Sequence, residues 1–241
     1  MTKRGFDLEL HRQILIRILV DIFKEFGGGM SFKGGTCAYL FYELPRISLD
    51  LDFDLLSPFE KKDVDILKAI LSKRGMIRDF KDKRYTVFFL LAYKEDAPNI
   101  KVEFNKRIWK NNTYKTVWFL GVEMRIADES TVVTNKLIAL SDRRMPVARD
   151  LFDGYYLLKL GFKLNDKLIM ERTGKTLKEY IEFLIPFIER TYSSKNILHG
   201  LGEVLEEKQK DWVRKELIRE MVKELKKLIN RKRRGEDKHS Q

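Results

Sequence analysis

The stretch Lys33-Gly34-Gly35-Thr36, followed by Arg46-Ile47-Ser48-Leu49-Asp50-Leu51-Asp52-Phe53-Asp54, decides the expected fold of this chain. Its second part alternates polar and apolar residues, which predicts a β-strand over residues 47–54. A strand points successive side chains to opposite faces. We therefore expect one polar face, made of Ser48, Asp50, Asp52 and Asp54, and one apolar face, made of Leu49, Leu51 and Phe53.

These residue types suit the chemistry of phosphate groups. Asp50 and Asp52, two apart on one strand, can hold a divalent metal between them, and Mg²⁺ prefers such oxygen ligands. Gly34 and Gly35 leave backbone amides free to contact a phosphate, and Thr36 offers a hydroxyl and an expected helix N-cap. An acidic strand alone usually presents a solvated face, and Gly-Gly-Thr alone is usually a turn. The acidic strand and the Gly-Gly-Thr segment together, at this spacing, indicate nucleotidyl or phosphoryl transfer.

The sequence on either side predicts an α+β portion up to about residue 129. Hydrophobic periodicity predicts helices and strands in alternation. The expected helices cover residues 7–26, 37–43 (beginning at Thr36) and 60–74. The expected strands cover residues 30–32, 47–54, 85–93, 100–104 and 116–124, in a mixed or antiparallel sheet.

From about residue 130 the pattern is helical. Helices are expected over residues 131–142, 149–161, 176–191 and 203–230, with Pro186 predicting a kink or two pieces in the third. The basic end, residues 231–241, is expected to be frayed. We therefore predict two domains, residues 1–129 and 130–241.

Composition narrows the class of protein. A formal net charge of +12 over 241 residues favours a polyanionic partner, either nucleic acid or an acidic protein, although it also fits simple solubility. Cys37 is the single cysteine, so no internal disulfide can form, and a cytoplasmic location is expected. The sequence contains no apolar run long enough for a membrane span, and residues 1–5 do not begin a signal peptide. The histidines show no zinc-site spacing.

Two groups of residues resemble the motifs of a known family. Lys33-Gly34-Gly35-Thr36 with Arg46, Ser48 and Asp50-Leu51-Asp52-Phe53 resembles the first motif of the AbiEii family. These are minimal nucleotidyltransferases that act as toxins of type IV-like toxin–antitoxin systems, a broad group that includes the mycobacterial MenT toxins. Lys136, Arg144 and Arg149-Asp150-Leu151-Phe152-Asp153 are similar to the family's later motifs. The resemblance covers roughly residues 10–190 and implies a polymerase β-type nucleotidyltransferase-like mixed sheet with a helical C-terminal part.

The resemblance also implies roles for individual residues. Asp50 and Asp52 would coordinate Mg²⁺ or Mn²⁺, and Gly35 and Thr36 would contact the β- and γ-phosphates of an NTP. Lys136 would neutralise triphosphate charge. Asp150 or Asp153, three apart and so on one helix face, would complete the later motif, and the sequence leaves open which of them faces the cleft.

Four other residues in or near these motifs also have expected roles. Lys33 and Arg46 would contact phosphate or pair with Asp54, and Ser48 would orient Asp50. Glu103 is either a third carboxylate of the site or a solvent-facing strand residue.

The expected reaction is transfer of NMP from an NTP to an acceptor hydroxyl, with two metals stabilising the attacking and leaving oxygens. The resemblance points to tRNA, at its acceptor end, or another RNA as the acceptor, and to a cognate antitoxin as a partner. The helical part is expected to close over the cleft. Three alternatives stay open: a catalytically inactive nucleotidyltransferase fold that docks RNA or protein, an enzyme that modifies a protein, and one that modifies a small molecule such as an aminoglycoside.

Overall fold

The acidic strand lies at the centre of a seven-stranded mixed sheet in the computed structural model, which describes residues 7–236. The strand order is β3-β4-β5-β2-β1-β7-β6. The strands are β1 (Met30–Lys33), β2 (Leu51–Leu55), β3 (Met76–Asp82), β4 (Thr86–Ala92), β5 (Ile100–Asn105), β6 (Tyr114–Phe119) and β7 (Val122–Ala127). β2 pairs antiparallel with β1 and parallel with β5, so the sheet is mixed.

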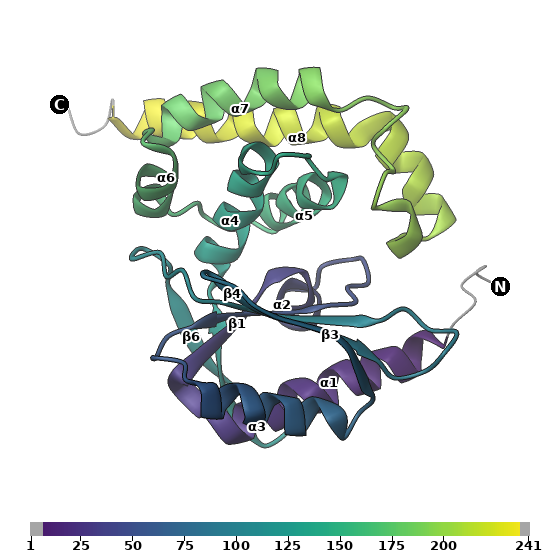
Figure 1. The fold of residues 1–241 in the computed structure, drawn as a ribbon. Coiled ribbons are helices and arrows are strands. Elements are labelled where there is room, and N and C mark those ends of the chain that lie inside the picture. The colour runs from purple at the N-terminus through teal and green to yellow at the C-terminus, as the bar shows by residue number, and fades with distance from the viewer. Residues whose placement is uncertain (1–6, 237–241) are drawn as a thin grey trace. The chain divides into compact units, whose positions relative to one another are not determined.

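Alternation along β2 separates a core face from a polar face. Phe53 is buried, and its ring centroid lies 6.1 Å from that of Phe23 in α1 (Leu8–Phe26) and 4.8 Å from that of Phe104 in β5. Helices α1 and α3 (Lys61–Ser72) lie on the same side of the sheet (Figure 1). The apolar faces of both helices supply the core that fixes β2, because burial of these side chains is the main favourable term in folding. Asp52 is thereby directed to the opposite face.

The structure divides into two compact units. The first holds the sheet with α1, α2 (Gly34–Phe41) and α3. The second contains residues 129–236 together with two short segments, residues 44–46 and 109–111. Its helices are α4 (Glu129–Asp142), α5 (Ala148–Lys159), α6 (Asp166–Thr173), α7 (Leu177–Thr191) and α8 (Glu207–Glu236). Single 3₁₀ turns, η1 (Gly27–Gly29) and η2 (Gly202–Val204), precede β1 and α8.

Several predicted elements need correction near the motif. The strand predicted over 47–54 begins only at Leu51, so Asp50 lies just before β2. Helix α2 begins at Gly34 rather than Thr36, and its N-cap is Lys33. The glycines therefore form the first turn of the helix instead of a loop before it, and Thr36 is not the cap.

The stretch predicted as one strand over 116–124 is a hairpin. β6 and β7 pair antiparallel around Leu120 and Gly121, whose φ angles are +49° and +76°. Two successive residues with positive φ reverse the chain in a two-residue hairpin turn. Because apolar residues lie on both sides of the turn, the sequence pattern does not indicate this reversal. β3 and α6 were not predicted.

The C-terminal helices also differ in detail. Helix α7 runs uninterrupted from Leu177 to Thr191 with Pro186 inside it, so the alternative of two pieces is wrong, and its buried face includes residues on both sides of the proline, such as Leu184 and Ile188. Helix α8 begins at Glu207 and extends to Glu236, so the backbone of residues 231–236 continues the helix, whereas the sequence predicted a frayed end from residue 231. The predictions for residues 1–5 and 237–241 lie outside the described residues.

Candidate active site

The first helical turn of α2 meets the acidic strand at Gly34. The register of β1, β2 and β5 sets Lys33 opposite Asp52 and Asp52 opposite Glu103. Gly34 has φ +79°, and a Cβ atom there would lie 2.3 Å from Asp52 Oδ2. Glycine is required at this position both for its backbone angle and for the approach of the carboxylate. The close approach holds Asp52 against the start of α2, where backbone N–H groups lack helical partners.

The Asp52 carboxylate lies in an electronegative setting. Burial raises its pKa above the ordinary value, and the charge of Asp50 raises it further, while Lys33 opposes the shift. Glu103, half-buried on the neighbouring strand, adds to the rise. Two carboxylates beside the start of a helix repel one another, and a divalent cation bound between them would relieve that repulsion. No group of three or more metal-ligating His, Cys, Asp or Glu residues occurs within residues 7–236.

The oxygen donors of Asp50 and Asp52 fit Mg²⁺ or Mn²⁺. Mg²⁺ is usually bound through one or two carboxylates and completed by water and substrate phosphates. Asp52 is the stronger candidate on geometry, because Gly34 leaves its carboxylate room at the helix start. Glu103 lies opposite Asp52 in the register of β2 and β5, but the two aspartates and Glu103 do not form a three-ligand metal site among the described residues.

Asp50 is held by hydrogen bonds from helix α2 and from strand β5. The Thr36 hydroxyl donates to its backbone carbonyl, and the Lys101 backbone N–H donates to its Oδ1 at 3.2 Å. His11 Nε2 lies 3.2 Å from the neighbouring carbonyl of Leu49, and its Nδ1 lies 2.8 Å from the Tyr93 hydroxyl. Burial lowers the pKa of His11, which favours the neutral ring. Within the described residues, Lys101 rather than the buried Ser48 orients the Asp50 carboxylate.

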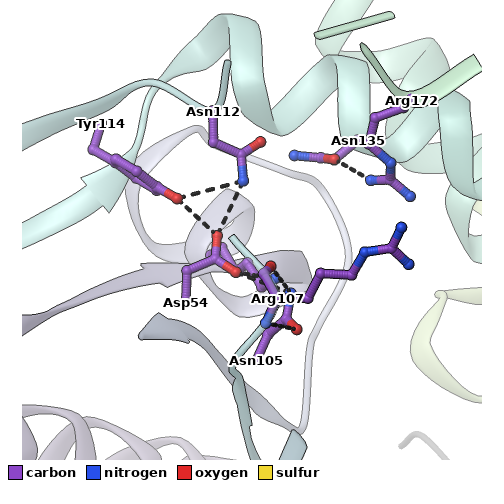
Figure 2. A network of polar contacts seen from close by, with 8 residues as sticks. Asp54, Asn105, Arg107, Asn112, Tyr114, Asn135 and Arg172 are labelled. Carbon is purple, nitrogen blue, oxygen red and sulfur yellow. Dashed lines mark hydrogen bonds and ion pairs between the residues drawn. The ribbon is translucent and has the colours of Figure 1, made fainter. Parts of the chain in front are cut away.

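Asp54, the third acid of the strand, has a different environment (Figure 2). Its buried carboxylate accepts from Lys33 Nζ at 2.5 Å, Tyr114 Oη at 3.1 Å, and the side-chain amides of Asn105 and Asn112 at 3.2 and 3.3 Å. Burial raises the pKa of Tyr114 and keeps its hydroxyl a donor. Lys33 thus pairs with Asp54, which was one of its two expected roles. Four donors leave Asp54 poorly suited to bind metal.

The second unit gathers the later motif into a buried ion cluster. Arg46 makes a two-point contact with Asp153, from Nε to Oδ1 and from Nη2 to Oδ2, both at 2.6 Å. Lys136 Nζ lies 2.8 Å from Asp153 and 3.0 Å from Asp150. Arg143 Nε lies 2.9 Å from Asp150. Asp150 and Asp153 therefore share one helix face, as their spacing predicted.

The charges in this cluster support one another. Burial alone would raise the pKa of Asp153, but Arg46 and Lys136 outweigh it and hold that pKa below its ordinary value. Burial alone would lower the pKa of Lys136, but Asp153 and Asp150 outweigh it and raise that pKa. Arg46 and Lys136 are charged at neutral pH, and both are engaged by carboxylates of α5.

Three of the partners of Asp54 lie outside both sequence motifs. Asn105, Asn112 and Tyr114 stand alone in the sequence with no spacing that marks them. Only the pairing of β5 and the course of the chain after it bring them to Asp54. Arg172 also lies outside the motifs; its Nη1 donates to Asn135 at 2.7 Å (Figure 2), and its guanidinium lies over the ring of Trp109.

Comparison with known proteins places these motifs in a family. The model of the family described as nucleotidyl transferase AbiEii toxin, type IV TA system, matches residues 17–234. The chain belongs to the AbiEii nucleotidyltransferase toxin family. No curated protein matches it. Two solved structures resemble this AbiEii protein along nearly their whole length.

The first of these structures is JHP933 from Helicobacter pylori, with a TM-score of 0.62 and 21% identity, covering 100% of both chains. The second, also from H. pylori and provisionally named a nucleotidyltransferase, has a TM-score of 0.56 and 22% identity, covering 95% of this chain and 99% of the other. At these identities the likeness supports the fold, and it confirms the predicted nucleotidyltransferase-like α+β class. None of the helices among residues 7–236 of the AbiEii protein could span a membrane.

Proposed function

We propose that this protein transfers a nucleoside monophosphate from an NTP to an RNA hydroxyl, with tRNA as the first acceptor to test, in a reaction that depends on Mg²⁺ or Mn²⁺. Membership of the AbiEii family supports the nucleotidyltransferase class and the toxin role. A cognate antitoxin and action in the cytoplasm belong to the same proposal. The observation that carries it is the Asp52 carboxylate held against Gly34, beside Asp50, at the start of α2.

The proposed step is an in-line displacement. The acceptor oxygen forms a bond to the α-phosphorus as the bond from that phosphorus to the bridging oxygen of the β-phosphate breaks, and pyrophosphate leaves. The proton of the acceptor hydroxyl passes to a carboxylate, for which Glu103 is the candidate because it lies opposite Asp52. A bound divalent ion would stabilise the attacking and leaving oxygens.

The protein's own groups would hold the triphosphate. The N–H groups in the first turn of α2 suit anionic oxygens, because the helix dipole adds positive potential there. Lys33 contributes charge near Asp52 even while it pairs with Asp54. Lys136 keeps its proposed role in neutralising phosphate charge, but it would have to do so while bound to Asp150 and Asp153.

The test uses the purified protein with Mg²⁺, each α-labelled NTP in turn, and total cellular RNA. We expect label in RNA, with one NTP preferred, and expect Asp52→Asn to reduce the rate about a hundredfold or more, since several kcal/mol of charge stabilisation are lost. Label found in protein or in an added aminoglycoside would redirect the acceptor assignment. Full activity of the variant would contradict the site. Absence of metal binding in the wild type would indicate an inactive docking fold.

The thermal stability of the same variant serves as an internal control. Because the folded-state pKa of Asp52 is raised, its stabilising contribution is present below the ordinary pKa of 3.8 and is lost as pH rises through the raised value. Ionised Asp52 therefore costs stability at neutral pH. We expect Asp52→Asn, without metal, to melt at or above the wild-type temperature at pH 7 and to lose that advantage near pH 4. A variant that melts lower at pH 7 would contradict the electrostatic account.

A further inference from the structure

Helix α8 and its neighbour α7 form a basic groove in the second unit. The groove has a volume of about 690 Å³ and is lined by five cationic side chains, Lys215, Arg219, Lys223, Lys226 and Lys227, against one carboxylate, Glu189. All five cations are exposed. We call this surface the α7–α8 groove. Figure 1 shows the two helices running side by side over most of α7.

The cations of the groove belong to a longer basic helix. Residues 207–236, which form α8, contain twelve Lys or Arg and six Asp or Glu, so this helix carries half of the chain's net charge of +12. Lys215, Arg219 and Lys223 are spaced four residues apart, which places them on one face about 6 Å apart along the axis. A second hollow, of about 370 Å³, shares Lys227 and adds Lys159 and Lys163.

Ion pairing leaves part of this charge uncompensated. Arg219, Lys223 and Lys227 pair with Glu216, Glu220 and Glu224, each one helical turn earlier. In each pair the cation is exposed and the carboxylate is half-buried, and pairs of this kind between neighbouring turns of one helix contribute little to stability. Within the described part of the chain, Lys215 and Lys226 make no ion pair with a carboxylate.

The apolar residues of the groove help to decide between two possible polyanionic partners, an acidic helix and a nucleic acid. An acidic amphipathic helix would need exposed apolar side chains in the groove as anchors. The apolar residues here are Ile218, which is half-buried, and Val222, which is only 7% exposed. The charged groups of the groove are four ammonium groups and one guanidinium group against one carboxylate, and this excess of cations suits a repeating phosphate backbone.

We propose that the α7–α8 groove binds the sugar-phosphate backbone of the RNA acceptor, an inference that rests on the proposed function. Contacts of this kind position a nucleic acid and carry no sequence information. The groove would therefore raise the affinity for RNA in general, and choice of the acceptor end would lie elsewhere.

The test compares two double variants with the same loss of charge. Lys215→Gln with Lys226→Gln removes the two unpaired cations of the groove. Lys178→Gln with Lys208→Gln removes two exposed lysines of the same helices that do not line it. Binding of bulk tRNA is measured by fluorescence anisotropy from about 50 to 300 mM KCl. We expect the groove variant to bind about five- to tenfold more weakly at low salt and its log–log salt slope to fall by about 0.7 to 0.9 per lost contact.

Three results would overturn the proposal: tRNA affinity equal in the two variants, polyglutamate of matched charge displacing tRNA from the wild type, or no salt-dependent binding of tRNA. Different results would count against the proposed function. Asp52→Asn should keep tRNA affinity and lose transfer, whereas the groove variant should raise KM for RNA and leave kcat and NTP binding unchanged. If tRNA binding depended on the groove but no nucleotide were transferred to RNA, the α7–α8 groove would stand as an RNA-binding surface and RNA would be rejected as the acceptor.

Discussion

Three acids at alternate positions of one segment have three different environments. Asp54 is buried and accepts from four donors, Asp52 lies against a glycine beside a second carboxylate, and Asp50 is held by Thr36 of α2 and Lys101 of β5. Like side chains thus acquire unlike properties, because burial and neighbouring charge set the energy of a carboxylate. Asp54 fixes the strand, which leaves Asp50 and Asp52 as the proposed metal ligands.

The first residue-scale prediction concerns Gly34→Ala. The added Cβ would meet Asp52 Oδ2 at 2.3 Å and would also sit at φ +79°. We expect transfer to fall about as far as in Asp52→Asn, because the carboxylate must move off the helix start. The measurement is the initial rate of NMP transfer at saturating Mg²⁺.

Gly121→Ala is the matched control for backbone strain. Gly121 has φ +76°, and no atom of the described residues lies within 4 Å of the place that an added Cβ would take, so this variant carries the conformational cost without the clash. Gly121→Ala should lose about 1–2 kcal/mol of stability from backbone strain, and Gly34→Ala should lose at least as much because it adds the clash. Equal activity of the two alanine variants would show that the approach to Asp52 is unimportant.

At the scale of elements, helix α5 organises the second unit around buried charge. Asp150 and Asp153 on this helix engage Lys136 of α4, and Asp153 also engages Arg46 from a short segment 107 residues earlier. A buried pair costs desolvation, and removal of one partner leaves an uncompensated charge. The cluster therefore specifies how α4, α5 and residues 44–46 pack.

We expect Asp153→Asn to destabilise the second unit by about 3–5 kcal/mol, since Arg46 and Lys136 lose their shared carboxylate. The effect depends on pH. Because the folded-state pKa of Asp153 is lowered, its stabilisation is present above the ordinary value of 3.8 and is lost as pH falls through the lowered one. Urea unfolding at pH 7 and at pH 3 measures both.

Asp142→Asn provides the comparison. Its carboxylate is 64% exposed and pairs with Arg172 alone among the ion pairs of the described residues, so the change should stay within about 0.5 kcal/mol. If Asp153→Asn proved as mild as Asp142→Asn, the buried cluster would not be what holds these helices.

At the scale of the whole molecule, membership of a toxin family gives a cellular prediction. Expression of the intact chain without a partner should arrest growth, because transfer of nucleotides to an essential RNA would stop translation. Asp52→Asn expressed to the same level should be harmless, and growth curves with immunoblots measure this. Arrest by the variant would separate toxicity from the proposed chemistry.

Much of the fold followed from periodicity. The residues of α1, α3, β4, β5, α4 and α5 repeat at helical or strand spacing, and these elements form close to where the pattern predicts them. The hairpin of β6 and β7 was mistaken for one strand because Leu120, an apolar residue, occupies a turn position. Helix α6 has a short and largely polar sequence with weak periodicity.

The sequence by itself determined the family, the order of most elements, and the acidic strand that follows the Gly-Gly pair, because motif spacing and side-chain periodicity are local properties of a chain. Only the tertiary structure decided that Asp54 is bound by four donors, that Asp52 rests on Gly34, and that Arg46 pairs with Asp153. Those partners lie far apart along the chain, and packing of the core selects them. Local sequence fixes which groups are available, and burial fixes which of them are paired.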